Sequence, residues 1–232
     1  MFRPVFLSHV NDPDTTPLFP GDPPFTLTAV HAEGYYLQRV DQGEHTGTHW
    51  GAPVHFDPDG RAADQLDATD LCRPAVVVDV REQAAADPDH AVTVAELQAF
   101  EVSHGRIPDG AAVLLWTGWD TRWGTPAYAN ADASGTPHQP GFSVAAVRWL
   151  LDTGRLGRQG ALGTDTFGPD PGADPTYAVS RLLYGEHRIT LENLAHLDRM
   201  PPAGAWVLAG GVRNRGGSGS PATVYGLIPD RA

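Results

Sequence analysis

The sequence predicts a single-domain α/β protein with a mixed, barrel-like β-sheet and flanking helices, and three observations support this class. Residues 75–78 read Ala-Val-Val-Val, a run typical of a strand buried on both faces. Thr93 and Glu96 have the spacing of a capping box, which predicts a helix from there to about His104. Residues 111–117 form a second apolar strand. Strand, helix and strand in this order are typical of an α/β layer.

Local signals predict the remaining elements in chain order. Asp, Pro and Gly accumulate in residues 12–24, which predicts an extended arm rich in turns. Alternating apolar and polar residues predict strands, and Ser143 before an apolar stripe predicts a capped helix. The strands are expected at 25–30, 35–40, 160–164, 205–209 and 223–228, and the helix at 143–151. No repeat or linker interrupts residues 1–232, so we expect one domain.

Composition excludes several classes of partner. The chain has a net charge of −12 and sixteen basic residues, all of them arginine, which argues against binding nucleic acid or an anionic membrane. Its single cysteine, Cys72, cannot form an intramolecular disulfide, and no run approaches the length of a membrane span. We therefore expect a cytoplasmic enzyme that acts on a small molecule.

Three histidines crowd the segment from residue 45 to residue 55. They are His45, His49 and His55, in a stretch that Gly47, Gly51 and a proline keep from forming a regular helix. Neutral imidazole is a common metal ligand and titrates near neutrality, so the cluster indicates metal coordination, proton transfer or both. Burying several imidazoles without a shared role would leave polar atoms to satisfy, which favours a functional site.

Aromatic and acidic residues near the expected loops are candidates for contact with a substrate. The long passage 117–140 is typical of a lid or binding loop, although large aromatic residues there can equally be its anchoring core. Asp165 follows a short strand in a turn, where aspartate often serves its own backbone. The candidate substrate-binding residues are Phe19, Trp50, Trp119, His138, Asp165, Phe167 and Ser180.

The histidine segment resembles the signature His-x-Gly-Thr-His-x-Asp-x-Pro-x-His of the metal-dependent cyclase family, which includes bacterial kynurenine formamidase, isatin hydrolase and polyketide cyclase-like proteins. This resemblance spans the chain from the Pro-Gly-Asp-Pro arm to the Gly-Ser-Gly loop near residue 218. It implies a kynurenine formamidase-like fold of the swivelling β/α type and a homodimer. It also places Phe19 and Asp165 near the substrate.

Two positions depart from the family pattern. Gly51 replaces an aspartate that ligates metal in the family, and Ser180 replaces a histidine that, together with the residue matching Glu192, holds a second ion. The resemblance therefore implies at most one Zn or Mn ion, bound by His45, His49 and a third group that is Glu192 or His55. The alternative is a site without metal, in which His55 and Glu192 transfer protons.

Three functions follow from these alternatives. The first is hydrolysis of an amide, formamide or lactone carbonyl in a small cyclic or aromatic substrate, with His55 as the general base or acid implied by the resemblance. The second is metal-independent aldol or dehydrative ring closure in natural-product (polyketide-type) biosynthesis, for which imidazolium or backbone donors would polarise the carbonyl. The third is ligand binding without catalysis, because two family ligands are missing.

Overall fold

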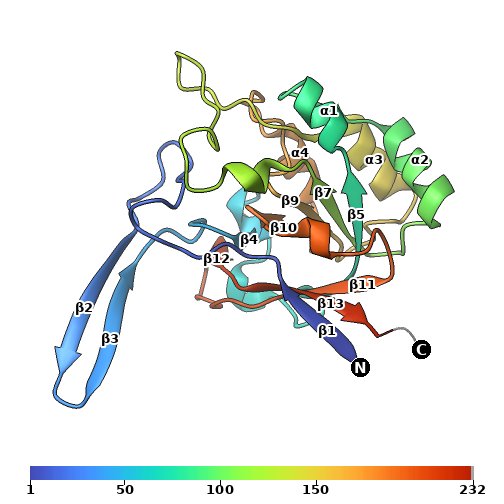
Figure 1. Cartoon of the computed structure of the whole chain (residues 1–232). Helices are drawn as coiled ribbons and strands as arrows, with labels where there is room; N and C mark the ends of the chain where they lie inside the picture. The colour runs from blue at the N-terminus through green and yellow to red at the C-terminus, as the bar shows by residue number, and fades with distance from the viewer. Residues whose placement is uncertain (231–232) are drawn as a thin grey trace.

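The computed structural model describes residues 1–230, which form one α/β domain around a curled nine-stranded sheet (Figure 1). Four neighbouring strands, β5, β7, β9 and β10, run parallel, and the remaining pairs are antiparallel. In spatial order the strands are β1 (Phe2–Phe6), β13 (Val224–Pro229), β11 (Ala205–Ala209), β5 (Cys72–Asp79), β7 (Ala112–Trp116), β9 (Ala161–Thr164), β10 (Ile189–Glu192), β4 (His49–Gly51) and β12 (Gly219–Pro221).

Helices pack against one face of the parallel strands. They are α1 (Arg81–Ala86), α2 (Val94–His104), α3 (Val144–Asp152) and α4 (Ala178–Leu183), and Figure 1 shows α1, α2 and α3 grouped beside β5 and β7. Alternate residues of each strand point to opposite faces. In β5, for example, Val76 and Val78 join the core beneath the helices, whereas Ala75 and Val77 join a second core inside the curl of the sheet. The parallel strands are therefore buried on both faces over most of their length.

A two-stranded hairpin projects from this body. Its strands are β2 (Thr26–Ala32) and β3 (Tyr35–Asp41), which pair antiparallel and extend away from the nine-stranded sheet (Figure 1). A further short pair joins β6 (Ala91–Val92) to β8 (Gly141–Phe142). β3 leads directly into the histidine segment, as the sequence predicts.

The structure confirms the predicted α/β class and most predicted elements. Thr93 Oγ1 accepts from the Glu96 amide at 3.3 Å while Glu96 Oε2 accepts from the Thr93 amide at 2.8 Å, so the capping box forms. Ser143 caps α3 by accepting from the Ala146 amide at 3.1 Å. Within residues 1–230, no helix is both long enough and apolar enough to cross a membrane.

β1 and β10 are among the strands that were not predicted, together with β4, β6, β8 and β12. β1 contains Pro4, which has no amide hydrogen to donate and so weakens the strand signal, and β1 lies at the edge of the sheet, where only one side of the strand is paired. β10 is only four residues long and follows directly on polar residues, so its sequence carries little periodic signal. Both are held by pairing with strands distant in sequence.

Candidate active site

The floor of the candidate site is built by two paired strands, β4 and β10. His49 lies directly opposite Glu192, and Gly51 lies directly opposite Thr190. Because successive residues of a strand face opposite sides, His49 and Gly51 share one face while Trp50 points into the core behind it. The alternation of β4 thus decides which residues of the histidine segment reach the site.

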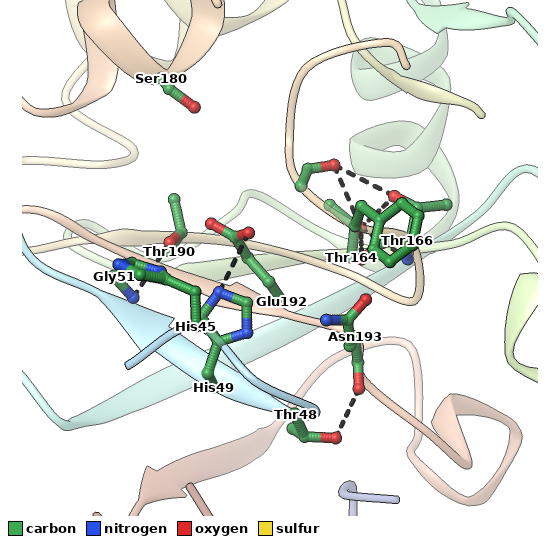
Figure 2. Close-up of polar contacts among 12 residues, drawn as sticks. His45, Thr48, His49, Gly51, Thr164, Thr166, Ser180, Thr190, Glu192 and Asn193 are labelled. Atoms are coloured by element: carbon green, nitrogen blue, oxygen red, sulfur yellow. Dashed lines mark hydrogen bonds and ion pairs between the residues drawn. The ribbon is translucent and has the colours of Figure 1, made fainter. Parts of the chain in front are cut away.

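His49 and Glu192 form a buried pair on this floor. His49 Nε2 lies 3.3 Å from Glu192 Oε2, and the two side chains are 3% and 13% exposed (Figure 2). The Gly47 carbonyl oxygen can only accept, so His49 Nδ1 carries a proton and donates it over 2.9 Å. When Nε2 of His49 also carries a proton, the facing carboxylate of Glu192 attracts the resulting positive charge. Glu192 therefore stabilises the cationic form of His49.

The pKa values of this pair shift in opposite directions. Burial alone would lower the pKa of His49, but the charge and hydrogen bond of Glu192 outweigh burial and raise it. Burial alone would raise the pKa of Glu192, yet the charge and hydrogen bond of His49 lower it to about 2. The site therefore keeps an ionised carboxylate and an imidazolium in contact.

His45 and His55 stack against each other beside this pair. Their ring centroids are 4.0 Å apart, and the planes are inclined by 24°. The Ser218 hydroxyl donates a hydrogen bond to Glu44 Oε2 at 3.0 Å. Ser218 Oγ therefore accepts a hydrogen bond from the N–H of His45 Nε2, at 2.9 Å. Burial, followed by the charges of the other two imidazoles, lowers the pKa of His45 to about 3. His45 is therefore neutral, with its proton on Nε2.

His55 is the most accessible of the three histidines. It ends a single 3₁₀ turn, Pro53–His55, and its side chain is exposed at the pocket. Partial desolvation lowers the pKa of His55, against the raising effect of Glu192. A neutral, accessible imidazole can take up a proton near neutral pH, as a general base requires.

A pocket of about 420 Å³ opens above the floor. Phe19 and Phe167 lie edge to face on it, with ring centroids 5.5 Å apart, and Phe56 and Tyr177 form a second aromatic pair at 5.4 Å. This size and lining suit a small aromatic or cyclic molecule. Of the predicted site residues, the pocket brings together Phe19, His45, His49, His55, Phe167, Ser180 and Glu192.

Sequence reasoning missed Asp22 as a pocket residue. The turn-rich arm carries its carboxyl group into the pocket, near the charges of His49, His55 and Glu192. Burial raises the pKa of Asp22, while the two imidazoles lower it. The Pro-Gly-Asp-Pro sequence that marked the arm was the available signal, but only the folded chain shows where the arm lies.

Ser180 lines the pocket from α4, across from the histidines (Figure 2). Its hydroxyl donates to Asp170 Oδ2 at 2.5 Å, and the same carboxylate accepts from the amides of Val179 and Ser180. Burial raises the pKa of Asp170, partly offset by these hydrogen bonds. Ser180 is thus engaged with its own helix terminus.

Four predicted substrate-binding residues lie away from the pocket. Trp50 is fully buried, and its Nε1 donates to the Gly210 carbonyl oxygen at 3.0 Å. Trp119 is anchoring core, as one of the two interpretations of its loop expected, and its Nε1 donates to the Tyr128 carbonyl oxygen at 2.8 Å. These two indoles support the walls of the site without lining it.

Asp165 and His138 are also placed elsewhere. Asp165 is completely buried and accepts hydrogen bonds from Thr117 Oγ1 at 2.7 Å and from the Trp119 amide at 3.0 Å. His138 is partly exposed and pairs with Asp89 at 2.7 Å, outside the residues that line the pocket. Neither side chain lines the pocket, and both have polar partners outside it.

The ligand set for a metal ion is incomplete in this chain. His49 and Glu192 are close enough to share an ion, but Gly51 supplies no side-chain donor and the Ser180 hydroxyl is bonded to Asp170. Within residues 1–230, no three His, Cys, Asp or Glu side chains are grouped to hold a metal. A hydrolytic metal site needs about three protein ligands. The residues present do not fit the expected Zn or Mn ion.

Comparison with known proteins identifies similar sequences. Residues 5–171 match the family model Cyclase, described as "Putative cyclase". Isatin hydrolase from Roseibium aggregatum is 37% identical over 193 residues, which cover 81% of this chain and 73% of that protein. Kynurenine formamidase from Bacillus cytotoxicus is 34% identical over 88 residues, which cover 36% of this chain and 39% of that enzyme.

Solved structures show the same similarity over nearly the whole chain. An isatin hydrolase bound to the product analogue thioisatinate superimposes with a TM-score of 0.91 at 30% identity, covering 99% of this chain and 93% of that one. The similarity thus includes β10 and Glu192, which lie beyond the region matched by the family model.

Proposed function

The chain belongs to the Cyclase family, and on that premise we propose that it hydrolyses an amide, formamide or lactone carbonyl of a small cyclic or aromatic molecule. It is an amidohydrolase-like or cyclase-like enzyme, so a purely ligand-binding role is not retained. The observation that carries the proposal is the convergence of three imidazoles and Glu192 in one pocket with aromatic walls. The relative from Roseibium aggregatum is named isatin hydrolase, and isatin is a cyclic amide of this class.

The proposed mechanism assigns proton transfer to His55. Its neutral ring takes a proton from water as the water attacks the carbonyl carbon, and returns that proton to the departing nitrogen or oxygen. Phe19 and Phe167 hold the flat part of the substrate, which places the carbonyl carbon near the imidazoles. No step is assigned to a metal ion, because the ligand set is incomplete.

Glu192 and His49 provide the charges of the site in this proposal. Glu192 lines the pocket as an ionised carboxylate and holds His49 as its imidazolium. Negative charge that develops on the carbonyl oxygen is stabilised by positive charge already fixed in the floor.

The test is a hydrolysis assay with two carbonyl classes. Isatin supplies a cyclic amide, and an N-formylated aromatic amine supplies a formamide; absorbance follows ring opening or deformylation. We expect turnover of one class by the native chain and a loss of about 10²- to 10³-fold in kcat for His55→Ala. His104→Ala, an exposed histidine on α2, is the control. No turnover of either class, or full activity in His55→Ala, contradicts the proposal.

A specific observation favours the second candidate function, metal-independent ring closure. Position 51 provides no carboxylate, and the remaining groups are suited to moving protons by acid–base chemistry. Enolisation and aldol closure need a base such as His55 and a fixed positive charge such as His49. Incubation with a linear aromatic polyketide mimic distinguishes the functions: cyclised product without hydrolysis of isatin would favour ring closure.

We also propose that the chain forms a homodimer through its projecting hairpin. A two-stranded hairpin is marginally stable alone, and exposed apolar residues grouped together mark interaction surfaces. The exposed apolar residues of β2 and β3 are Val30, Tyr35, Tyr36, Leu37 and Val40. Light scattering should give twice the chain mass, reduced to a monomer by Tyr36→Glu with Leu37→Glu but not by Val102→Glu on α2. A monomeric native chain contradicts this.

A further inference from the structure

The space beside Gly51 is filled by two buried hydroxyl groups. A Cβ atom built at this position would lie 2.3 Å from Tyr184 Oη and 2.7 Å from Thr190 Oγ1, both inside the 3.0 Å that real Cβ contacts respect. Tyr184 is 1% exposed and Thr190 is fully buried, so neither side chain can turn out into solvent. No side chain fits at position 51 while both hydroxyls remain.

These hydroxyls are hydrogen-bonded to each other and to the backbone of β4. Thr190 Oγ1 accepts from the Gly51 amide at 3.2 Å and lies 2.8 Å from Tyr184 Oη. Thr190 and Glu192 lie two residues apart on the same face of β10, opposite Gly51 and His49. The Gly51 amide can only donate, so Thr190 Oγ1 is its acceptor, and either hydroxyl can donate in the bond between Thr190 and Tyr184.

The strand register shows what this arrangement replaces. Position 51 faces the same side of β4 as His49, and its partner Thr190 faces the same side of β10 as Glu192. A carboxylate at position 51 would therefore stand beside the imidazole and the carboxylate of the floor. In this chain the hydroxyls of Tyr184 and Thr190 stand there instead.

We propose that Tyr184 and Thr190 replace the third metal-ligating group of the site, bracing β4 against β10 beside His49 and Glu192 through hydrogen bonds, in a floor that binds no metal ion. The inference deepens the proposed function and rests on it for the identity of the site. Tyr184 does not line the pocket, so it acts on the floor only through Thr190 and is a positioning residue.

The second altered position is engaged in a similar way. Ser180 donates its hydroxyl proton to Asp170, and both side chains are largely buried. A metal ligand at this position would have to abandon that bond and leave Asp170 with fewer donors. Both departures from the family pattern are thus accompanied by local hydrogen bonds that use the altered residues.

A mutant cycle tests the steric part of the proposal. Gly51→Ala is made in the native chain and in a Tyr184→Phe/Thr190→Ala background, where both hydroxyls are absent and the ring carbon of residue 184 stays at an ordinary 3.5 Å. We expect Gly51→Ala to lower Tm by at least about 5 °C in the native chain and by less than about 2 °C in the background variant. Equal losses in both backgrounds overturn the proposal.

Metal titration tests the functional part without any substrate. MnCl₂ and ZnCl₂ are titrated calorimetrically into the native chain and into Gly51→Asp/Tyr184→Phe/Thr190→Ala, with Tyr184→Phe/Thr190→Ala as the control lacking the new carboxylate. We expect one ion per chain and a metal-dependent rise in Tm only for the variant carrying the aspartate. Stoichiometric binding by the native chain, or none by that variant, overturns the proposal.

The positioning role has its own measurement. Tyr184→Phe removes one hydroxyl and nothing that touches the pocket, so on any substrate that the native chain turns over it should lower kcat about tenfold while leaving KM unchanged. A rise in KM alone, or no change in kcat, contradicts the role. If the native chain turns over no substrate, the proposed function is wrong. The mutant cycle and the metal titration still test whether Tyr184 and Thr190 replace the metal-ligating group, because neither needs a substrate.

Discussion

Two buried carboxylates at the ends of neighbouring strands show how differently the same group can be used. Glu192 ends β10, and Asp165 directly follows β9, which pairs with β10 in parallel. Glu192 faces imidazoles, which lower its pKa to about 2 in spite of burial. For Asp165 burial dominates over its neutral donors and raises the pKa to about 6.

The difference teaches that burial alone does not make a carboxylate functional. Neutral hydrogen bonds let Asp165 fasten the Thr117 loop to the end of β9, where it is fully enclosed. A charged partner lets Glu192 remain ionised at the floor of an open pocket. The first arrangement stabilises the scaffold, and the second supplies charge for chemistry.

The largest effect is expected for a substitution of Glu192, the functional carboxylate of this comparison. Glu192→Gln keeps the shape but removes the charge, so His49 loses the partner that holds it as a cation. We expect kcat for carbonyl hydrolysis to fall by about 10³-fold, in the range of lost acid–base and electrostatic catalysis, with the circular dichroism spectrum unchanged. Steady-state kinetics on the substrate found above measure this, and activity within tenfold of native would refute it.

The matched change on the structural side is Asp165→Asn. One of its two oxygens becomes an NH₂ group, which cannot accept from the Thr117 or Trp119 amides. Leaving a buried donor unpaired should lower the free energy of unfolding by about 1–3 kcal/mol. Urea unfolding measures the loss, and activity per folded molecule should stay within a few-fold of native. A loss of activity without a loss of stability would reverse the two roles.

The pH dependence of the free energy of unfolding tests the role of Asp165 further. The pKa of Asp165 is about 6 in the folded chain and near 3.8 when unfolded, so between these values the folded chain binds the extra proton. Its contribution to stability is thus present below pH 3.8 and lost as pH rises through 6. The stability difference between native and Asp165→Asn should shrink over this window by at most about 1.4 kcal/mol per pH unit. A constant difference would show that Asp165 does not titrate there.

The smallest expected effects compare a pocket wall with a surface histidine. Phe19→Ala removes one ring of the edge-to-face pair with Phe167, which should raise KM about three- to tenfold, in keeping with about 0.5–1.5 kcal/mol for an aromatic pair. His138→Ala should leave kcat and KM unchanged, because His138 pairs with Asp89 outside the pocket. An effect of His138→Ala equal to that of Phe19→Ala would restore His138 as a substrate contact.

Much of the fold could be predicted because its signals are local. The capping box at Thr93, the cap at Ser143 and the apolar run of β5 each depend on residues a few positions apart, and each is confirmed. β1 and β10 could not be predicted in this way, because their strand conformation is stabilised by hydrogen bonds to β13 and to β4 and β9. Nonlocal pairing leaves little trace in a four- or five-residue segment.

The sequence by itself determined the composition of the site: three histidines on a glycine-containing segment, Glu192, and the two altered positions Gly51 and Ser180. These are matters of residue identity. Tertiary structure alone decided which residues meet. The alternation of β4 turns Trp50 into the core and His49 toward the floor of the pocket, and the arm folds over to add Asp22. Tyr184 reaches Gly51 only because α4 packs beside β10, and this contact makes glycine necessary there.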